Sequence, residues 1–359
     1  MTDEIWKNEE RAVFTLRSLY RRYGYAPYKM SRFEEYDLYV RNKDFLVSDQ
    51  IITFSDGSGR LLALKPDVTL SIVKNAPEAP GAVQKVYYNE NVYRDYREIM
   101  QAGLECVGDL GDYEIAEVVL LAVKSLQLLG DRFVLDISHM GLIAAVLDSC
   151  GLSGQERKQA MECLRRKNRH ELRQLAQSND AAWVKLSTLL SCRGSGQEVL
   201  DRVGAVLTTD PERQALEELR SLWKILESSG FENAVRLDFS VGSGGMHYYS
   251  GVVFRGYLAG IPASILSGGQ YDKLARKMGK RCRAIGFAIY LDLLQDGQRQ
   301  DSAFDVDTLI LHDGTVDTAV LTAAAEAAAK DGSVLVTEVL PKDRNWKKLV
   351  RFVYGEAVQ

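Results

Sequence analysis

The chain has 359 residues, of which 46% are hydrophobic and 26% are charged, with a formal net charge of -4 at pH 7. This length and composition suit a globular protein of two or three domains with a sizeable core. The slight negative charge provides no overall basic field, so the totals do not support a role that depends on non-specific capture of nucleic acid.

The first third of the chain is predicted to hold one helix followed by short strands. Apolar residues recur at helical spacing from Glu9 to Tyr23, and Gly24 follows as a stop signal, which predicts an amphipathic helix. Runs of strand-forming residues come next, separated by turn residues: QIITFSD, RLLALKPDVT, AVQKVYYNENVYR and AGLECVG. Because short polar turns join adjacent runs, we expect an antiparallel sheet.

The middle of the chain is predicted to be largely helical. Residues 115–129 read as a helix that ends at Gly130, and a strand, RFVLDIS, follows it. From about Gly141 to Gly230 the sequence is charged, rich in Leu and Ala, and helical in period, which predicts an all-helical insertion. Strand character returns in AVRLDFSVG, HYYSGVVFRGYL, ASILSGG and RAIGFAIYL, so the insertion interrupts one sheet domain.

The tail, from about Phe304, predicts a small α/β unit. DTLILHD and SVLVTEVL have strand patterns and flank a helical segment, and the remaining residues have room for a final short helix. We therefore predict three parts. A core domain comprises residues 1–140 and 231–300, the helical insertion comprises residues 141–230, and a C-terminal α/β domain comprises residues 301–359.

Several common catalytic signatures are absent from the sequence. There is no GxxxxGK[ST] loop, no GxGxxG after a strand, no GxSxG elbow and no HExxH pair. The VGSGG segment lies between two predicted strands, which is more typical of a hairpin turn than of a phosphate cradle. The five cysteines never form a CxxC pair, so neither a disulfide framework nor a metal site is predicted. A reducing cytoplasm fits this use of cysteine, and no segment is long and apolar enough for a membrane span.

Polar side chains recur at matching positions of the predicted strands. Asp67 and Thr69 in LKPDVTL are two residues apart and would share one strand face, as would Gln101 and Glu105 in QAGLE. The segments HYYSG and GGQYD add Tyr248, Tyr249 and Tyr271. Carboxylates, an amide, a hydroxyl and phenols would suit a small zwitterion that carries donors, such as an amino acid. The same pattern also fits a polar sheet face that is open to solvent.

The segments LKPDVTL, KVYYNENVYRDYREIMQAGLECVG, GGMHYYSGVVF and SGGQYDKL follow one another along the chain. The second resembles the second signature motif of class II aminoacyl-tRNA synthetases. The others resemble the RPEGT strand and the RGLDYY and GGRYD segments of histidyl-tRNA synthetases. The likeness runs from the first helix to about Asp296 and implies an α+β class II synthetase-like fold. In that fold a six-stranded antiparallel sheet is flanked by helices, usually in a dimer.

The departures from the synthetase pattern fall on residues that handle ATP. The third synthetase motif ends in an arginine that holds the ATP phosphates, and Leu293 stands at that position. Gly244 and Gln270 align with the arginines of RGLDYY and GGRYD, and Tyr96 with the acid that would meet adenine. One well-placed cation is worth about 3 to 5 orders of magnitude in phosphoryl-transfer rate, so the resemblance implies that adenylate formation is lost. Arg94 is kept, either to bind a ligand carboxylate or as part of a structural ion pair.

The residues that the resemblance assigns to histidine itself are retained. Asp67, Thr69 and Gln101 correspond to the surroundings of the ammonium group, and the imidazole would lie against Glu105, Tyr249 and Tyr271. Arg94 and Tyr248 complete the histidine-binding set. No catalytic residue, metal or cofactor is predicted.

A kept amino-acid pocket beside a lost ATP site resembles the regulatory subunits of ATP phosphoribosyltransferase, which are paralogues of the synthetases. The resemblance implies a cytoplasmic, non-catalytic homodimer that assembles with the short catalytic subunit in the first step of histidine biosynthesis. Histidine would inhibit the complex by favouring one quaternary state. Two alternatives stay open: an active histidine–tRNA ligase, and a stand-alone histidine sensor or tRNA-binding module.

Overall fold

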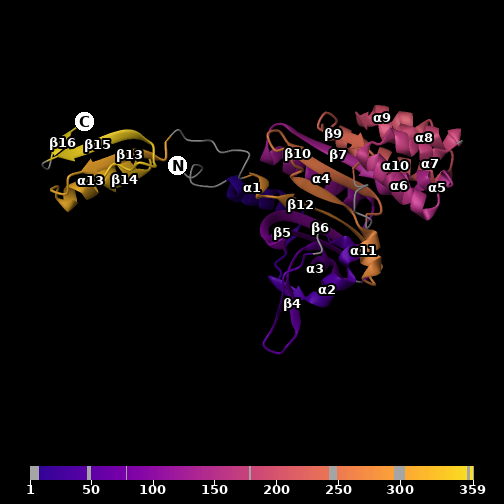
Figure 1. Cartoon of the computed structure of the whole chain (residues 1–359), viewed down its shortest axis with the longest axis horizontal. Coiled ribbons are helices and arrows are strands. Elements are labelled where there is room, and N and C mark those ends of the chain that lie inside the picture. The colour runs from indigo at the N-terminus through magenta and orange to yellow at the C-terminus, as the bar shows by residue number, and fades with distance from the viewer. Residues whose placement is uncertain are drawn as a thin grey trace. The chain divides into compact units, whose positions relative to one another are not determined.

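The computed structural model describes residues 8–46, 50–77, 79–177, 179–241, 249–294, 304–353 and 356–358. The chain folds as two compact units, Met1–Gly297 and Gln298–Gln359 (Figure 1). The first is built on a nine-stranded sheet and the second on a four-stranded sheet. Within the described ranges, every helix is too short or too polar to cross a membrane.

The large sheet has the strand order β1-β5-β6-β12-β11-β10-β7-β9-β8. The six strands from β5 to β7 pair antiparallel throughout, as predicted. The prediction of six strands was incomplete, because β1 and β9 add parallel pairs and β8 extends the sheet beyond β9. The strands are β1 (Ala26–Pro27), β5 (Val83–Arg94), β6 (Arg97–Gly108), β7 (Phe133–His139), β8 (Arg193–Gly194), β9 (Val235–Asp238), β10 (Val252–Leu258), β11 (Leu266–Gln270) and β12 (Arg283–Tyr290).

The two faces of this sheet have different coverings. Helices α1 (Asn8–Arg22) and α4 (Asp112–Leu129) cover one face, where Leu104 and Cys106 join the main hydrophobic core. Because side chains alternate along a strand, Glu105 points to the opposite face. That face meets a second apolar cluster, to which α2 (Tyr36–Arg41), α3 (Thr69–Lys74) and α11 (Asp272–Lys277) contribute.

A small sheet in the same unit corrects one local prediction. Its strands run in the order β2 (Phe33–Glu35), β4 (Leu61–Leu64) and β3 (Thr53–Ser55). The strand β4 ends before Pro66, and Thr69 begins α3, so the prediction that Asp67 and Thr69 share a strand was wrong. Proline cannot donate to a strand ladder, and Asp67 Oδ1 instead accepts a hydrogen bond of 2.9 Å from the Leu70 N–H, which stabilises the first turn of α3.

Residues 141–230 form a helical cluster beside β7 and β9 (Figure 1). They were predicted to be wholly helical, but the two-residue strand β8 lies among them and joins the large sheet. Their apolar side chains belong to the same hydrophobic cluster as α4 and the sheet. The division of the first unit into core and insertion therefore stays a prediction. The helices are α5 (Met140–Ser149), α6 (Gly154–Arg166), α7 (Arg169–Ala176), α8 (Asp180–Ser191), α9 (Gly196–Gly204) and α10 (Asp210–Ser228).

The second unit is the predicted α/β unit with one difference. Helix α13 (Thr318–Ala329) accompanies the strand order β14-β13-β15-β16. The predicted final helix is wrong, because the last residues form β15 and β16, and β15 lies parallel to β13. Its valines and aromatic residues favour a strand. The strands are β13 (Val306–His312), β14 (Val334–Thr337), β15 (Trp346–Val353) and β16 (Glu356–Val358).

Candidate functional site

A cavity on the sheet face opposite α1 and α4 brings together seven of the eight predicted site residues. The eighth, Tyr248, lies outside the described residues, as does Gly244. The loop before α3, the strands β5 and β6, and segments beside β10 and β11 all contribute side chains to this cavity. The seven residues are Asp67, Thr69, Arg94, Gln101, Glu105, Tyr249 and Tyr271.

Glu105 is the centre of the hydrogen bonding in the cavity. Thr69 Oγ1 donates to Glu105 Oε1 at 2.7 Å, and the Tyr271 hydroxyl donates to Oε2 at 2.5 Å. Burial raises the pKa of Glu105 to about 8, an effect that the two hydrogen bonds oppose and the nearby Asp67 carboxylate reinforces. The carboxyl group is thus held in place and poised to change its charge near neutral pH.

Gly286 on β12 makes room for this carboxyl group. It lies directly across from Glu105 in the sheet. A Cβ atom at position 286 would lie 1.6 Å from Glu105 Oε2, so any side chain there would displace the carboxylate. The glycine in RAIGFAIYL is therefore required by the cavity itself.

Asp67 and Arg94 form a second charged group in the cavity. The Arg94 guanidinium lies 3.7 Å from Asp67 Oδ2, and its Nε donates to the Pro66 carbonyl at 2.6 Å. The structure contains the ion pair with Asp67, and the binding of a ligand carboxylate by Arg94 stays a prediction. Burial raises the pKa of Asp67, and the guanidinium opposes that shift. Two carboxyl groups with a single paired cation favour a ligand that brings its own positive charge.

Gln101 supplies a polar group that the fold leaves unsatisfied. Its side chain is 2% exposed, and its Nε2 has no hydrogen-bond partner among the described residues. Leaving a buried donor unpaired costs about 1 to 3 kcal/mol, so a ligand acceptor at this point would be stabilised. The free volume of the cavity is only about 60 Å³, enough for a few water molecules. A whole amino acid could enter only if the lining side chains moved apart.

Several residues that line the cavity were not predicted from the sequence, among them Tyr88, Tyr290 and Phe45. Tyr88 lies opposite Gly103, where a Cβ atom would come within 2.6 Å of the phenol oxygen. Because Tyr88 and Arg94 are six residues apart on β5, strand alternation would have placed them on the same face. Phe45 lies in a short 3-10 helix (Lys43–Phe45) and has no comparable periodic signal.

Several known proteins are similar to this chain. A family model described as histidyl-tRNA synthetase matches residues 1–294. The ATP phosphoribosyltransferase regulatory subunit of Syntrophotalea carbinolica is 31% identical, over 77% of this chain and 68% of that protein. The subunit of the same name from Clostridium kluyveri is 30% identical, over 77% of this chain and 74% of that protein. The chain belongs to the family of ATP phosphoribosyltransferase regulatory subunits.

A solved structure agrees with this assignment to the regulatory-subunit family. The protein described as an ATP phosphoribosyltransferase regulatory subunit/histidyl-tRNA synthetase from Bacillus halodurans superposes with a TM-score of 0.77. It is 25% identical, and the match covers 97% of this chain and 94% of that one. The class II synthetase-like fold predicted from the motifs is therefore confirmed.

Three positions at which this member of the regulatory-subunit family departs from the synthetase motifs lie in the described part of the chain, and each carries an uncharged side chain: Tyr96, Gln270 and Leu293. Gln270 donates its amide N–H to Asp272 Oδ2 at 2.7 Å, and Leu293 packs against the main hydrophobic core. Tyr96 is 82% exposed in the two-residue turn that joins β5 to β6. Asp95 and Tyr96 both have positive φ, of 50° and 61°, as the tight turns of hairpins often require.

Proposed function

We propose that the chain is a non-catalytic subunit that activates a short-form ATP phosphoribosyltransferase catalytic subunit and makes it sensitive to histidine. The observation that supports this proposal is the cavity around Glu105, where seven of the eight predicted histidine-binding residues meet and Arg94 is the single cation among the lining residues. The names of the relatives support the partnership. The assembly would contain homodimers of this chain within a hetero-oligomer, in the cytoplasm.

The chemistry of the cavity suits histidine among the amino acids. The Glu105 carboxylate would accept an imidazole N–H, and the Tyr271 phenol would lie at the same end of the ring. Asp67 would attract the ammonium group, and the unsatisfied Gln101 amide would donate to a ligand acceptor. A site built to bond these polar groups would reject an amino acid that lacks them, because its own buried groups would then stay unpaired.

The small free volume gives a route to regulation. Since histidine can enter only when lining side chains move apart, it would bind more tightly to an expanded state of the cavity than to this one. A ligand that binds two states with different affinity shifts the equilibrium between them. Feedback inhibition would follow if the two states bind or activate the catalytic subunit differently.

Loss of the synthetase reaction is the second half of the proposal. Leu293 and Gln270 are neutral at positions where the synthetases use arginine, so the charge that develops during adenylate formation would be left without compensation. The chain should therefore give no histidine-dependent exchange between ATP and pyrophosphate. Exchange at a rate typical of synthetases would favour the histidine–tRNA ligase alternative. Histidine binding without exchange would fit both a regulatory subunit and a stand-alone histidine sensor.

Reconstitution separates the regulatory subunit from the sensor. The purified chain would be mixed with a short-form catalytic subunit, and phosphoribosyl transfer measured from ATP and phosphoribosyl pyrophosphate with and without L-histidine. We expect activity that depends on this chain and that falls when L-histidine is added. If the activity does not rise at any ratio of the two proteins, the proposal is wrong.

A further inference from the structure

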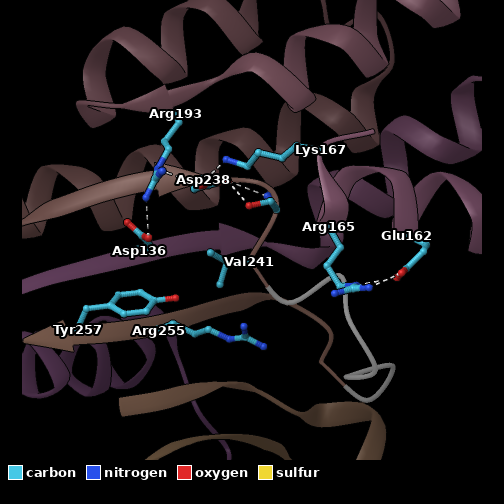
Figure 2. Close-up of a pocket in the computed structure, with 10 residues that line it drawn as sticks. Asp136, Glu162, Arg165, Lys167, Arg193, Asp238, Val241, Arg255 and Tyr257 are labelled. Atoms are coloured by element: carbon cyan, nitrogen blue, oxygen red, sulfur yellow. Dashed lines mark hydrogen bonds and ion pairs between the residues drawn. The ribbon is translucent and has the colours of Figure 1, made fainter. Parts of the chain in front are cut away.

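A second cavity, of about 640 Å³, lies between the large sheet and the helices of residues 141–230 (Figure 2). Its size falls in the range of small-molecule sites. The sheet contributes Arg255 and Tyr257 of β10 and Arg193 of β8, and the helical side contributes Arg165 and Lys167. None of the side chains that line this cavity also lines the first one.

The two buried carboxylates of this cavity are already compensated. Asp136 accepts hydrogen bonds of 2.7 and 3.1 Å from Arg236, which lies outside the lining. Asp238 pairs with Lys167 and with Arg193, at 3.1 Å in each case. Both carboxylates are therefore paired with cations of the protein, and among the described residues neither forms an ion pair with a residue of β10.

Arg255 lies at the same cavity but takes no part in the ion pairs of Asp136 and Asp238. Its side chain is half-buried, and it forms no ion pair or hydrogen bond with any residue in the described part of the chain. Figure 2 shows Arg255 and Tyr257 on the same strand, with both side chains at the cavity. Across the cavity, Arg165 pairs only with Glu162 of its own helix within the described ranges. The lining therefore carries four cations against three carboxylates, with Arg236 as a further cation just behind them.

The conformation of Lys167 adds to the positive side of the cavity. It directly follows α6 as the C-cap residue and has a φ of 55°, in the left-handed region that favours glycine. From this position its Nζ reaches Asp238. The backbone N–H of Lys167 donates to the carbonyls of Cys163 and Leu164, which stabilises this conformation at the end of the helix.

We propose that this cavity binds a phosphate-bearing small molecule of nucleotide or sugar-phosphate size, with its phosphate on Arg255 and its body beside Tyr257. The guanidinium fork matches two phosphate oxygens, and a neutral donor such as the phenol can complete the contact. A phosphate monoester carries about 1.5 to 2 negative charges at neutral pH, so it gains more from a lining with excess cations than a carboxylate does.

The sheet connects this anion site to the first cavity. Arg255 lies directly across from Ser267, and Ser267 lies across from Ala288. Both Ser267 and Ala288 line the first cavity. The two ligands would therefore bind to adjacent stretches of one sheet face. The anion site does not depend on the proposed function, and it can be tested on the isolated chain.

Calorimetric titration of the full chain with three probes tests the site: inorganic phosphate, ribose 5-phosphate and AMP, with adenosine as the ligand that lacks phosphate. We expect saturable binding of AMP and ribose 5-phosphate, weaker binding of phosphate, and none of adenosine. Arg255→Gln should weaken AMP binding at least about tenfold, since a hydrogen bond to a charged group is lost. The AMP affinity of Arg255→Lys should lie between those of the unaltered chain and Arg255→Gln, because lysine keeps the charge but lacks the two-pronged guanidinium group.

Arg213→Gln is the matched control. It removes an arginine that is exposed on α10, pairs with Asp210 and lies outside both cavities. This variant should bind AMP as the unaltered chain does. Unchanged thermal unfolding of Arg255→Gln would show that it folds. Three results would overturn the proposal: no saturable binding of any phosphate probe at millimolar concentration, equal AMP affinity in Arg255→Gln and the unaltered chain, or adenosine binding as tight as that of AMP.

Discussion

Replacing Glu105 by Gln should stabilise the protein at neutral and alkaline pH and change its stability little in acid. The amide is nearly the same size, can accept the hydrogen bond from Thr69, and can donate to the Tyr271 oxygen. It cannot ionise. The difference between the variant and the unaltered protein therefore isolates the free energy of placing a charge in this cavity.

The sign and size follow from the two pKa values. Below the ordinary value of 4.5, Glu105 is protonated in the folded and the unfolded chain, so it adds no pH dependence. Between 4.5 and about 8 the unfolded chain loses this proton while the folded protein keeps it, and stability falls as pH rises. Above that window both states are ionised and the full penalty is present. At about 1.4 kcal/mol for each pH unit, the penalty is roughly 4 to 5 kcal/mol.

Urea unfolding between about pH 5 and pH 9 measures this difference. The gain in unfolding free energy of Glu105→Gln over the unaltered protein should be near zero at about pH 5 and grow to a few kcal/mol by pH 9. Glu98→Gln, which removes an exposed carboxylate from the same strand, is the control and should show no such growth. Parallel pH profiles of Glu105→Gln and the unaltered protein would refute the reasoning.

Two further substitutions test the packing of the first unit. Gly286→Ala should destabilise the fold by about 1 to 3 kcal/mol and abolish histidine binding, because its Cβ would displace the Glu105 carboxylate. Thermal melting and histidine titration measure the two effects. Gly57→Ala is the control and should show neither effect, because a Cβ atom there would meet no atom within 4 Å. Lys185→Met should cost about 3 to 5 kcal/mol in urea unfolding, since it leaves the fully buried Glu212 without its 2.7 Å partner. A loss below about 1 kcal/mol would mean that this pair does not hold the helices together.

Much of the candidate site could be predicted because strand alternation is a reliable guide to shared faces. Gln101 and Glu105 were in phase on β6, and the structure places both in one cavity. Asp67 and Thr69 reach the same cavity, but from a loop and a helix start, since Pro66 ends the strand character that the sequence suggested. The motif order predicted the right neighbours even where the local conformation was wrong.

Other features of the fold and of the site depend on contacts between distant residues, which a local sequence pattern cannot predict. The ion pair of Arg94 with Asp67 needs the pairing of two segments that are far apart in the sequence, and the role of Gly286 needs its register against Glu105. The strand β15, where a final helix was predicted, pairs in parallel with β13, and this long-range contact is not visible in the sequence of the segment itself. The second cavity joins residues of the sheet and of the helices, so neither part predicts it alone.

The central claim is that the first cavity binds free histidine and does not activate it. Calorimetric titration of L-histidine into the unaltered chain, Glu105→Gln and Glu98→Gln tests the binding most directly. We predict saturable binding to the unaltered chain and to Glu98→Gln, and affinity at least about tenfold weaker for Glu105→Gln, which loses a hydrogen bond to a charged group. No saturable heat with the unaltered chain at millimolar histidine, or equal affinity in all three proteins, would contradict the claim.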